Sequence, residues 1–130
     1  MSEISHLFVY GTLQPGDARW PILAPYVADS GVADRVAGRV HDTGCGYPAA
    51  IFGPDGTIVG RTYQLREELL DKALAVLDEE ESSVPGGYRR VVVTTSAGTP
   101  AWAYEYGCGL ELRHIDSGDW LQSGVSDPGL

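Results

Sequence analysis

The sequence predicts an α+β domain built on a curled, largely antiparallel sheet. Two observations lead to this expectation. Short runs of β-favouring residues, broken by glycine and proline, recur along most of the chain. One longer segment, residues 66–77, instead carries leucine and alanine at three- and four-residue spacing. Taken in order, the segments read β-α-β-β-β-α-β-β, with about six strands and two or three helices.

The N-terminal part is expected to form a strand, a turn, a short helix and a second strand. Residues 7–10 read LFVY, a β-favouring run that ends at Gly11. Turn-forming residues occupy 14–17, and a short helix is expected over 18–27. Residues 31–40 alternate loosely between valine and other residues, which favours an extended strand.

The middle of the chain is expected to hold a β-hairpin. Residues 49–52 and 57–65 favour strands, and the run Gly-Pro-Asp-Gly at 53–56 between them is a turn signal. Side chains along 57–65 alternate between two faces, as in a half-buried strand. We therefore expect two strands that pair with each other across this turn.

The second half is expected to contain the main helix and two more strands. The apolar stripe of residues 66–77 is expected to pack on the sheet, and the helix to continue through the acidic run 78–81. Residues 88–96 and 100–106 are β-rich and are joined by three residues that include a glycine, which suits a hairpin.

Length and composition indicate one folded domain. A chain of 130 residues with 43% hydrophobic residues is large enough to bury a core without disulfides or a metal. We expect a single domain over residues 1–130, with its core at about 6–121 and a flexible tail at 122–130.

Charge and cysteine content narrow the partners and the compartment. Nine basic and eighteen acidic residues give a net charge of -9, which disfavours nucleic acid and membrane surfaces as partners. The N-terminus has no basic leader, and no apolar run approaches the roughly 20 residues that span a bilayer. Cys45 and Cys108 form no CxxC motif, so a reduced cytoplasmic protein is expected. Nothing indicates the oligomeric state.

The run Asp78-Glu79-Glu80-Glu81 has three possible explanations. Adjacent carboxylates at the C-terminal end of a helix oppose its macrodipole, so they are either solvated or functional. A solvated acidic helix end is the commoner case. A metal site is the third possibility, and it is disfavoured because no histidine lies at ligand spacing.

Two further features could carry chemistry. The turn at residues 10–13 follows a strand, and its main-chain N–H groups are able to hold a carboxylate or an oxyanion, although an ordinary turn has the same pattern. Cys45 lies near His41 in the sequence, and Cys108 lies near His114. Inert thiols are favoured over nucleophiles because the sequence shows no motif that would activate either cysteine.

Four motifs occur in a fixed order along the chain. They are LFVYGTL at 7–13, LDEEE at 77–81, YRRV at 88–91 and SGDW at 117–120, with GYPA at 46–49 and VGRTY at 59–63 as further matches. In this order and spacing they resemble the γ-glutamylcyclotransferase-like family, which includes the AIG2-like proteins and γ-glutamylamine cyclotransferases. The resemblance covers residues 6–121.

The resemblance implies a fold and a reaction. The fold would be a small, largely antiparallel β-barrel flanked by two or three helices. The enzyme would release 5-oxoproline when the α-amine of a γ-glutamyl unit attacks its own γ-carbonyl, a step that needs neither a cofactor nor a metal. The substrate would be a γ-glutamyl amino acid, a γ-glutamylamine or a γ-glutamyl group within a biosynthetic intermediate.

The resemblance also implies roles for individual residues. Glu81 matches the catalytic glutamate of the family, although an alignment shifted by one residue would select Glu80. Tyr10, Gly11, Thr12 and Leu13 match the turn whose main-chain amides grip the substrate, and Tyr88 would lie close to the glutamate.

One residue departs from the family pattern. The family has glycine directly after its glutamate, where this chain has Ser82. The alternative to the enzyme is therefore a non-catalytic module that binds a small molecule or a protein on the same fold.

Overall fold

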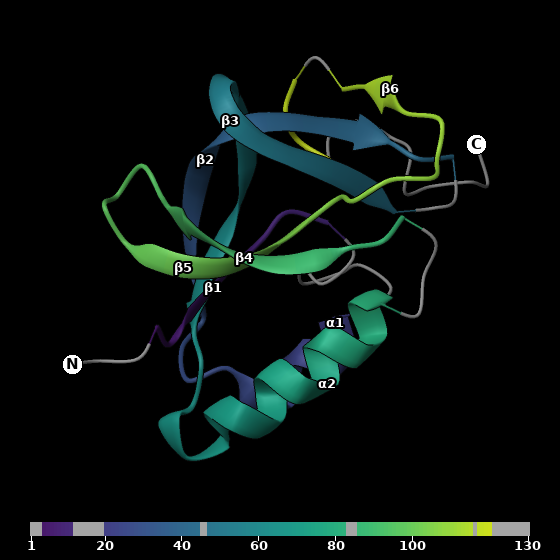
Figure 1. Cartoon of the computed structure of the whole chain (residues 1–130). Coiled ribbons are helices and arrows are strands. Elements are labelled where there is room, and N and C mark those ends of the chain that lie inside the picture. The colour runs from purple at the N-terminus through teal and green to yellow at the C-terminus, as the bar shows by residue number, and fades with distance from the viewer. Residues whose placement is uncertain (1–3, 12–19, 45–46, 83–85, 116, 121–130) are drawn as a thin grey trace.

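One curled sheet of six strands forms the body of the molecule (Figure 1). The computed structural model describes residues 4–11, 20–44, 47–82, 86–115 and 117–120. Its strands are β1 (His6–Val9), β2 (Val32–Asp42), β3 (Pro48–Gln64), β4 (Arg89–Thr94), β5 (Pro100–Glu105) and β6 (Arg113–His114), in the order β4-β5-β1-β3-β2-β6. Neighbouring strands are antiparallel except β1 and β5, which are parallel. The predicted α+β class is confirmed, and the sheet forms a half-barrel.

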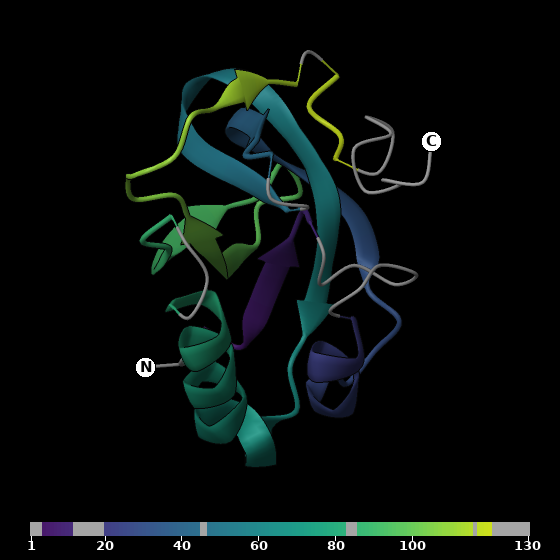
Figure 2. The same cartoon turned by 90° about the vertical axis from the view of Figure 1, so that its right-hand side faces the viewer.

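The helices lie together on one side of this sheet (Figure 2). The helix expected over residues 18–27 contains α1 (Trp20–Leu23) and the 3₁₀ turn η1 (Ala24–Tyr26). The main helix begins with the 3₁₀ turn η2 (Glu67–Leu69) and continues as α2 (Leu70–Ser82), so it includes the whole acidic run. In the ranges that the structure describes, no helix is long and apolar enough to cross a bilayer.

The hairpin expected around residues 53–56 is wrong. Both flanking segments belong to β3 and pair with the same strand, β2, in the same direction. Ala37 is opposite Thr57 and the next residue, Gly38, is opposite Phe52, so the four residues between those partners form a bulge. Glycine and proline at this place interrupt a continuing strand and do not reverse it, which a turn signal alone does not distinguish.

The first half of β3 reaches the end of β5 and thereby curls the sheet. The main-chain N–H of Tyr106 donates to the carbonyl of Ala50 at 2.9 Å. The N–H of Phe52 donates to Oε2 of Glu105 at 3.1 Å. The other half of β3 pairs with β1, so this one strand contacts both β1 and the end of β5.

Strand β1 is buried on both faces along residues 7–9, which explains why these three residues are all apolar. Leu7 and Val9 belong to a cluster that also contains the helix residues Leu23 and Leu77. Phe8 belongs to a second cluster on the opposite face. Because successive strand side chains alternate between faces, one short strand supplies both clusters.

The SGDW motif closes the second cluster. Trp120 is 0% exposed and packs within it. The carbonyl of Gly118 accepts the N–H of Val59 at 2.8 Å. Gly118 has a φ of +71°, and a Cβ there would collide with the carbonyl oxygen of Thr57. This motif therefore has a structural explanation.

Replacing Trp120 with alanine is expected to lower the free energy of unfolding by about 3–5 kcal/mol, because it empties a fully buried site. Urea denaturation measures the change. The control Val92→Thr alters a valine that is 52% exposed, and it should change stability by less than about 0.5 kcal/mol. A loss below about 1 kcal/mol for Trp120→Ala would contradict the packing described for this residue.

Candidate active site at the end of helix α2

Glu81 extends the buried stripe of α2. The buried residues of this helix are Leu70, Ala73, Leu77 and Glu81, at three- and four-residue spacing. A carboxylate therefore occupies a position at which the helical spacing predicts another apolar side chain. Glu81 is 7% exposed, and burial of a carboxylate costs free energy unless partners compensate it.

The rest of the acidic run has different surroundings. Glu79 is exposed, as a solvated helix end predicts, and its carbonyl accepts the hydroxyl of Ser82 at 3.1 Å. Asp78 and Glu80 are partly buried. Glu81 is thus the one buried carboxylate of the four, and Ser82 is directed to the solvent side of the same helical turn.

Tyr10 lies directly after β1 and is buried. Its hydroxyl donates to the main-chain carbonyl of Tyr104 at 2.6 Å. Burial raises the pKa of Tyr10 well above its ordinary value, and the charges of Glu81 and Tyr88 raise this pKa further, while the N–H of Ala50 opposes the shift. Tyr10 therefore stays a protonated hydrogen-bond donor at physiological pH, and the negative charge of Glu81 contributes to keeping it so.

Pro48, the first residue of β3, joins Gly11 to Tyr88. The hydroxyl of Tyr88 donates to the carbonyl of Pro48 at 2.6 Å. A Cβ added to Gly11 would lie 2.5 Å from Cγ of the Pro48 ring, so the chain fits here only because residue 11 has no side chain. The ring of Tyr88 also makes edge contacts with Tyr47 and Tyr106, with 6.1 Å between centroids in each pair.

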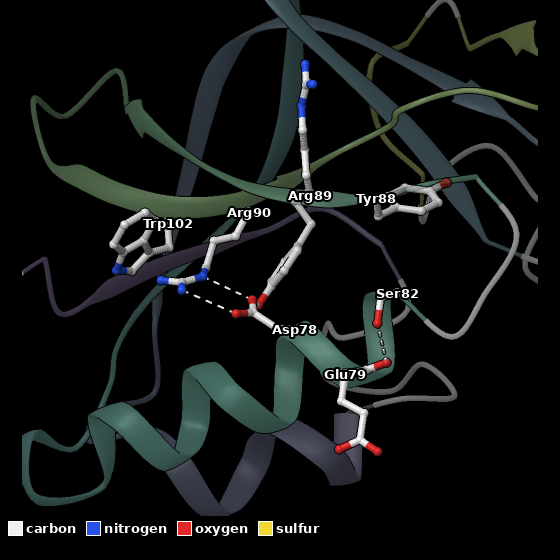
Figure 3. A pocket seen from close by; sticks show the side chains of 8 residues that line it. Asp78, Glu79, Ser82, Tyr88, Arg89, Arg90 and Trp102 are labelled. Atoms are coloured by element: carbon white, nitrogen blue, oxygen red, sulfur yellow. Dashed lines mark hydrogen bonds and ion pairs between the residues drawn. The ribbon is translucent and has the colours of Figure 1, made fainter.

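Asp78 is fixed to the sheet one turn before Glu81 (Figure 3). Arg90 on β4 donates to both of its carboxylate oxygens, from Nε at 3.0 Å and from Nη2 at 3.2 Å. The hydroxyl of Tyr104 on β5 donates to Oδ1 of Asp78 at 2.7 Å. The Arg90 guanidinium also stacks on the ring of Trp102, 4.2 Å from the centroid. We refer to Asp78, Arg90, Trp102 and Tyr104 as the Asp78 clamp.

A pocket of about 750 Å³ opens beside this clamp, between the end of α2 and strands β4 and β5. Tyr88 and Ser82 also line it, which brings the pocket next to the turn that carries Glu81. Burial raises the pKa of Tyr104, as do its hydrogen bond to Asp78 and the nearby charge of Glu81. Tyr104 therefore stays a neutral hydrogen-bond donor at physiological pH.

Three comparisons with known proteins bear on this arrangement. Residues 7–122 match the model of the family described as "Gamma-glutamyl cyclotransferase, AIG2-like". The chain belongs to this family. It is 36% identical over 93 residues to a protein of Halalkalibacterium halodurans named "Putative gamma-glutamylcyclotransferase", an alignment that covers 66% of this chain and 80% of that protein.

Solved structures of similar proteins share the fold of this family member. The solution structure of the Escherichia coli protein ytfP is 31% identical, covers 89% of this chain and 96% of its own, and has a TM-score of 0.59. A crystal structure of an AIG2-like protein from Mus musculus, at 20% identity and 88% coverage of each chain, has a TM-score of 0.52. An uncharacterized protein from Pyrococcus horikoshii, at 24% identity and 90% coverage of each chain, has a TM-score of 0.66.

Two of the predicted site residues, Gly11 and Tyr88, both contact Pro48. Tyr10 and Glu81 are also buried, and the charges of Glu81 and Tyr88 raise the pKa of Tyr10. The other two predicted residues, Thr12 and Leu13, lie outside the described residues.

Sequence reasoning missed the clamp. The carboxylate of Asp78, treated as part of a solvated run, binds Arg90, and the two residues are 12 positions apart. Alternation along 88–91 places Arg89 and Arg90 on opposite faces of a strand, but it does not reveal which arginine faces the helix.

The cysteine and histidine alternatives gain no support from the described residues. Cys108 is an exposed thiol, and Cys45 lies outside the described ranges. The ring of His114 lies 5.4 Å from that of His41 between centroids, on paired strands β6 and β2. Across the ranges described, no group of three or more histidine, cysteine, aspartate or glutamate side chains is placed to hold a metal ion.

Gly11→Ala is expected to destabilise the protein by about 1–3 kcal/mol, because the new methyl group overlaps the Pro48 ring. Pro48→Ala removes the overlapping ring atoms. In a double-mutant cycle followed by urea denaturation, the double variant should therefore recover part of the loss caused by Gly11→Ala. Purely additive losses would show that the contact with Pro48 is not what restricts residue 11.

Tyr10→Phe is expected to cost about 1 kcal/mol of stability at neutral pH, because the bond to the Tyr104 carbonyl is lost. A raised tyrosine pKa contributes stability that is complete below the unfolded-state pKa of about 10 and is lost as the pH rises toward the folded-state value. The stability difference between wild type and Tyr10→Phe should therefore shrink above about pH 10. Tyr26→Phe, on η1, serves as the control. A stability difference between wild type and Tyr10→Phe that does not change with pH would refute this expectation.

Proposed function

We propose that this protein is a γ-glutamyl cyclotransferase in which Glu81 transfers the protons. The observation that carries the proposal is a buried carboxylate at the end of α2, Glu81, whose charge also helps to raise the pKa of the buried Tyr10. Family membership supports the reaction type, and burial favours Glu81 over Glu80 as the active group.

In the proposed reaction, the neutral α-amine of the γ-glutamyl unit attacks the γ-carbonyl carbon, so a ring C–N bond forms and the carbonyl oxygen becomes an oxyanion. As this bond forms, the attacking nitrogen passes one proton to Glu81. Collapse of this intermediate breaks the original amide bond, and Glu81 returns the proton to the departing nitrogen. The products are 5-oxoproline and an amine or amino acid. One carboxylate serves as general base and then as general acid.

The tyrosines of the site are suited to shaping it and not to proton transfer. Each phenol has one proton, and those of Tyr10 and Tyr88 are donated to the carbonyls of Tyr104 and Pro48. The raised pKa of Tyr10 also keeps its hydroxyl protonated. Glu81 is thus the group left to move protons, and the proposed role of the turn at residues 10–13 is to bind the oxyanion or the substrate α-carboxylate with main-chain N–H groups.

The non-catalytic alternative rests on Ser82. That residue is exposed, and its hydroxyl bonds the helix backbone at Glu79, so the departure from glycine does not displace the buried side chain of Glu81. The burial of Glu81 beside an exposed Ser82 therefore favours the enzyme over the binding module.

The decisive experiment measures 5-oxoproline release from γ-glutamyl amino acids and γ-glutamylamines. Glu81→Gln should lower kcat by roughly 100- to 10,000-fold, because it removes the proton-transferring group and keeps its size. Glu80→Gln, the matched control on the same helical turn, should retain activity. Loss in Glu80→Gln alone would move the site by one residue, and no turnover by folded wild type across both substrate classes would favour the binding module.

A further inference from the structure

The charges at the C-terminal end of α2 are unfavourable for the helix. Four consecutive carboxylates, residues 78–81, lie where the helix macrodipole is already negative, and the last turn contains no basic residue. Glu81 adds the cost of burial to this repulsion. A helix end of this kind tends to fray unless another element supplies positive charge.

Arg90 supplies that charge from β4. Its two hydrogen bonds to Asp78 use the fork geometry of the guanidinium, which fixes orientation as well as distance. Its other contact is the stacked ring of Trp102, whose Nε1 in turn donates to the carbonyl of Ile4 at 3.0 Å. The Arg90 side chain is 25% exposed and that of Asp78 is 44% exposed, so it is the two-bond geometry and the stacking on Trp102 that distinguish this pair from a typical surface ion pair.

Tyr104 connects the clamp to the site. Its hydroxyl binds Asp78 and its main-chain carbonyl binds the hydroxyl of Tyr10. The Asp78 carboxylate that binds this hydroxyl also binds Arg90, and the negative charge of Glu81 helps to raise the pKa of Tyr104. A single residue of β5 therefore bonds both to the helical turn preceding Glu81 and to Tyr10.

We infer that Asp78 is a positioning residue: its bonds to Arg90 and Tyr104 hold the last turn of α2 so that the Glu81 carboxylate stays buried against the sheet. This inference rests on the proposed function for its catalytic consequence. Its structural half, that the clamp orders residues 79–82, holds whether or not the protein turns over a γ-glutamyl substrate.

A matched pair of variants separates this role from general stability. Arg90→Gln breaks the clamp. Arg89→Gln instead breaks the ion pair between Arg89 on β4 and Glu105 on β5, which are 3.2 Å apart and do not include a residue of α2. The Arg89 side chain is 69% exposed and points away from Asp78 (Figure 3). Asp78→Asn is a second test of the clamp if Arg90→Gln fails to fold.

The first readout is independent of activity. Amide hydrogen exchange at residues 79–82 should become roughly 10-fold faster in Arg90→Gln and in Asp78→Asn, and should stay within about 2-fold of wild type in Arg89→Gln. Equal exchange in all the proteins would overturn the inference, whatever the outcome of the activity assay. Faster exchange combined with an inactive wild type would uphold the clamp and reject only the proposed function.

The second readout is the catalytic one. A misplaced base should lower kcat by roughly 10- to 100-fold with KM within about 3-fold of wild type in both clamp variants.

The pH dependence of kcat on its acidic side gives a further test, because the two clamp variants should shift it in opposite directions. Loss of the Arg90 cation should move this acidic limb to higher pH, and loss of the Asp78 anion should move it to lower pH. The other titratable groups that share these electrostatic effects with Glu81 are Tyr10 after β1, Tyr88 before β4, and Tyr104 and Glu105 on β5. Burial raises the pKa of Tyr10 and of Tyr104, so these two stay neutral. An unchanged kcat in both clamp variants would refute the positioning role.

Discussion

The buried hydroxyl of Tyr10 lies where three strands meet. Tyr10 directly follows β1, and its hydroxyl donates to the carbonyl of Tyr104 on β5 at 2.6 Å. The main-chain N–H of Ala50, on β3, lowers the pKa of the same hydroxyl. Strand β3 also meets the end of β5 where the N–H of Tyr106 donates to the carbonyl of Ala50. A buried phenol without these partners would cost free energy, so the curl of the sheet and the position of the Tyr10 ring are parts of one arrangement.

Burying the Glu81 carboxylate costs free energy, and other contacts of α2 offset this cost. A carboxylate with 7% exposure loses most of its hydration. The buried leucines of the same stripe favour docking of the helix, and the Asp78–Arg90 pair brings a cation to a helix end that has none of its own. Apolar packing thus holds the helix body, while charge pairing holds the turn that carries Glu81.

How far the sequence could predict this arrangement depends on the range of the interactions. The stripe of α2 is local, so its period over residues 66–77 predicts the helix; the resemblance selects Glu81, and the structure adds that Glu81 continues the stripe. The sequence predicts a hairpin where β3 has its bulge, because glycine and proline at residues 53–56 look the same in a strand that turns back and in one that continues past an interruption. The pairing of Tyr10 with Tyr104 spans 94 residues, and no local pattern encodes it.

The arginines bear on how a γ-glutamyl substrate would be held. An acidic protein can still present a positive pocket, yet three of its arginines have internal partners. Arg61 donates to the carbonyls of Ser30 and Gly31, Arg89 pairs with Glu105, and Arg90 pairs with Asp78. Each of these guanidinium groups orders the fold, so recruiting one for a substrate carboxylate would break an existing bond. Main-chain N–H groups of a turn require no such exchange, which favours the turn at residues 10–13 as the anion-binding element of the proposed site.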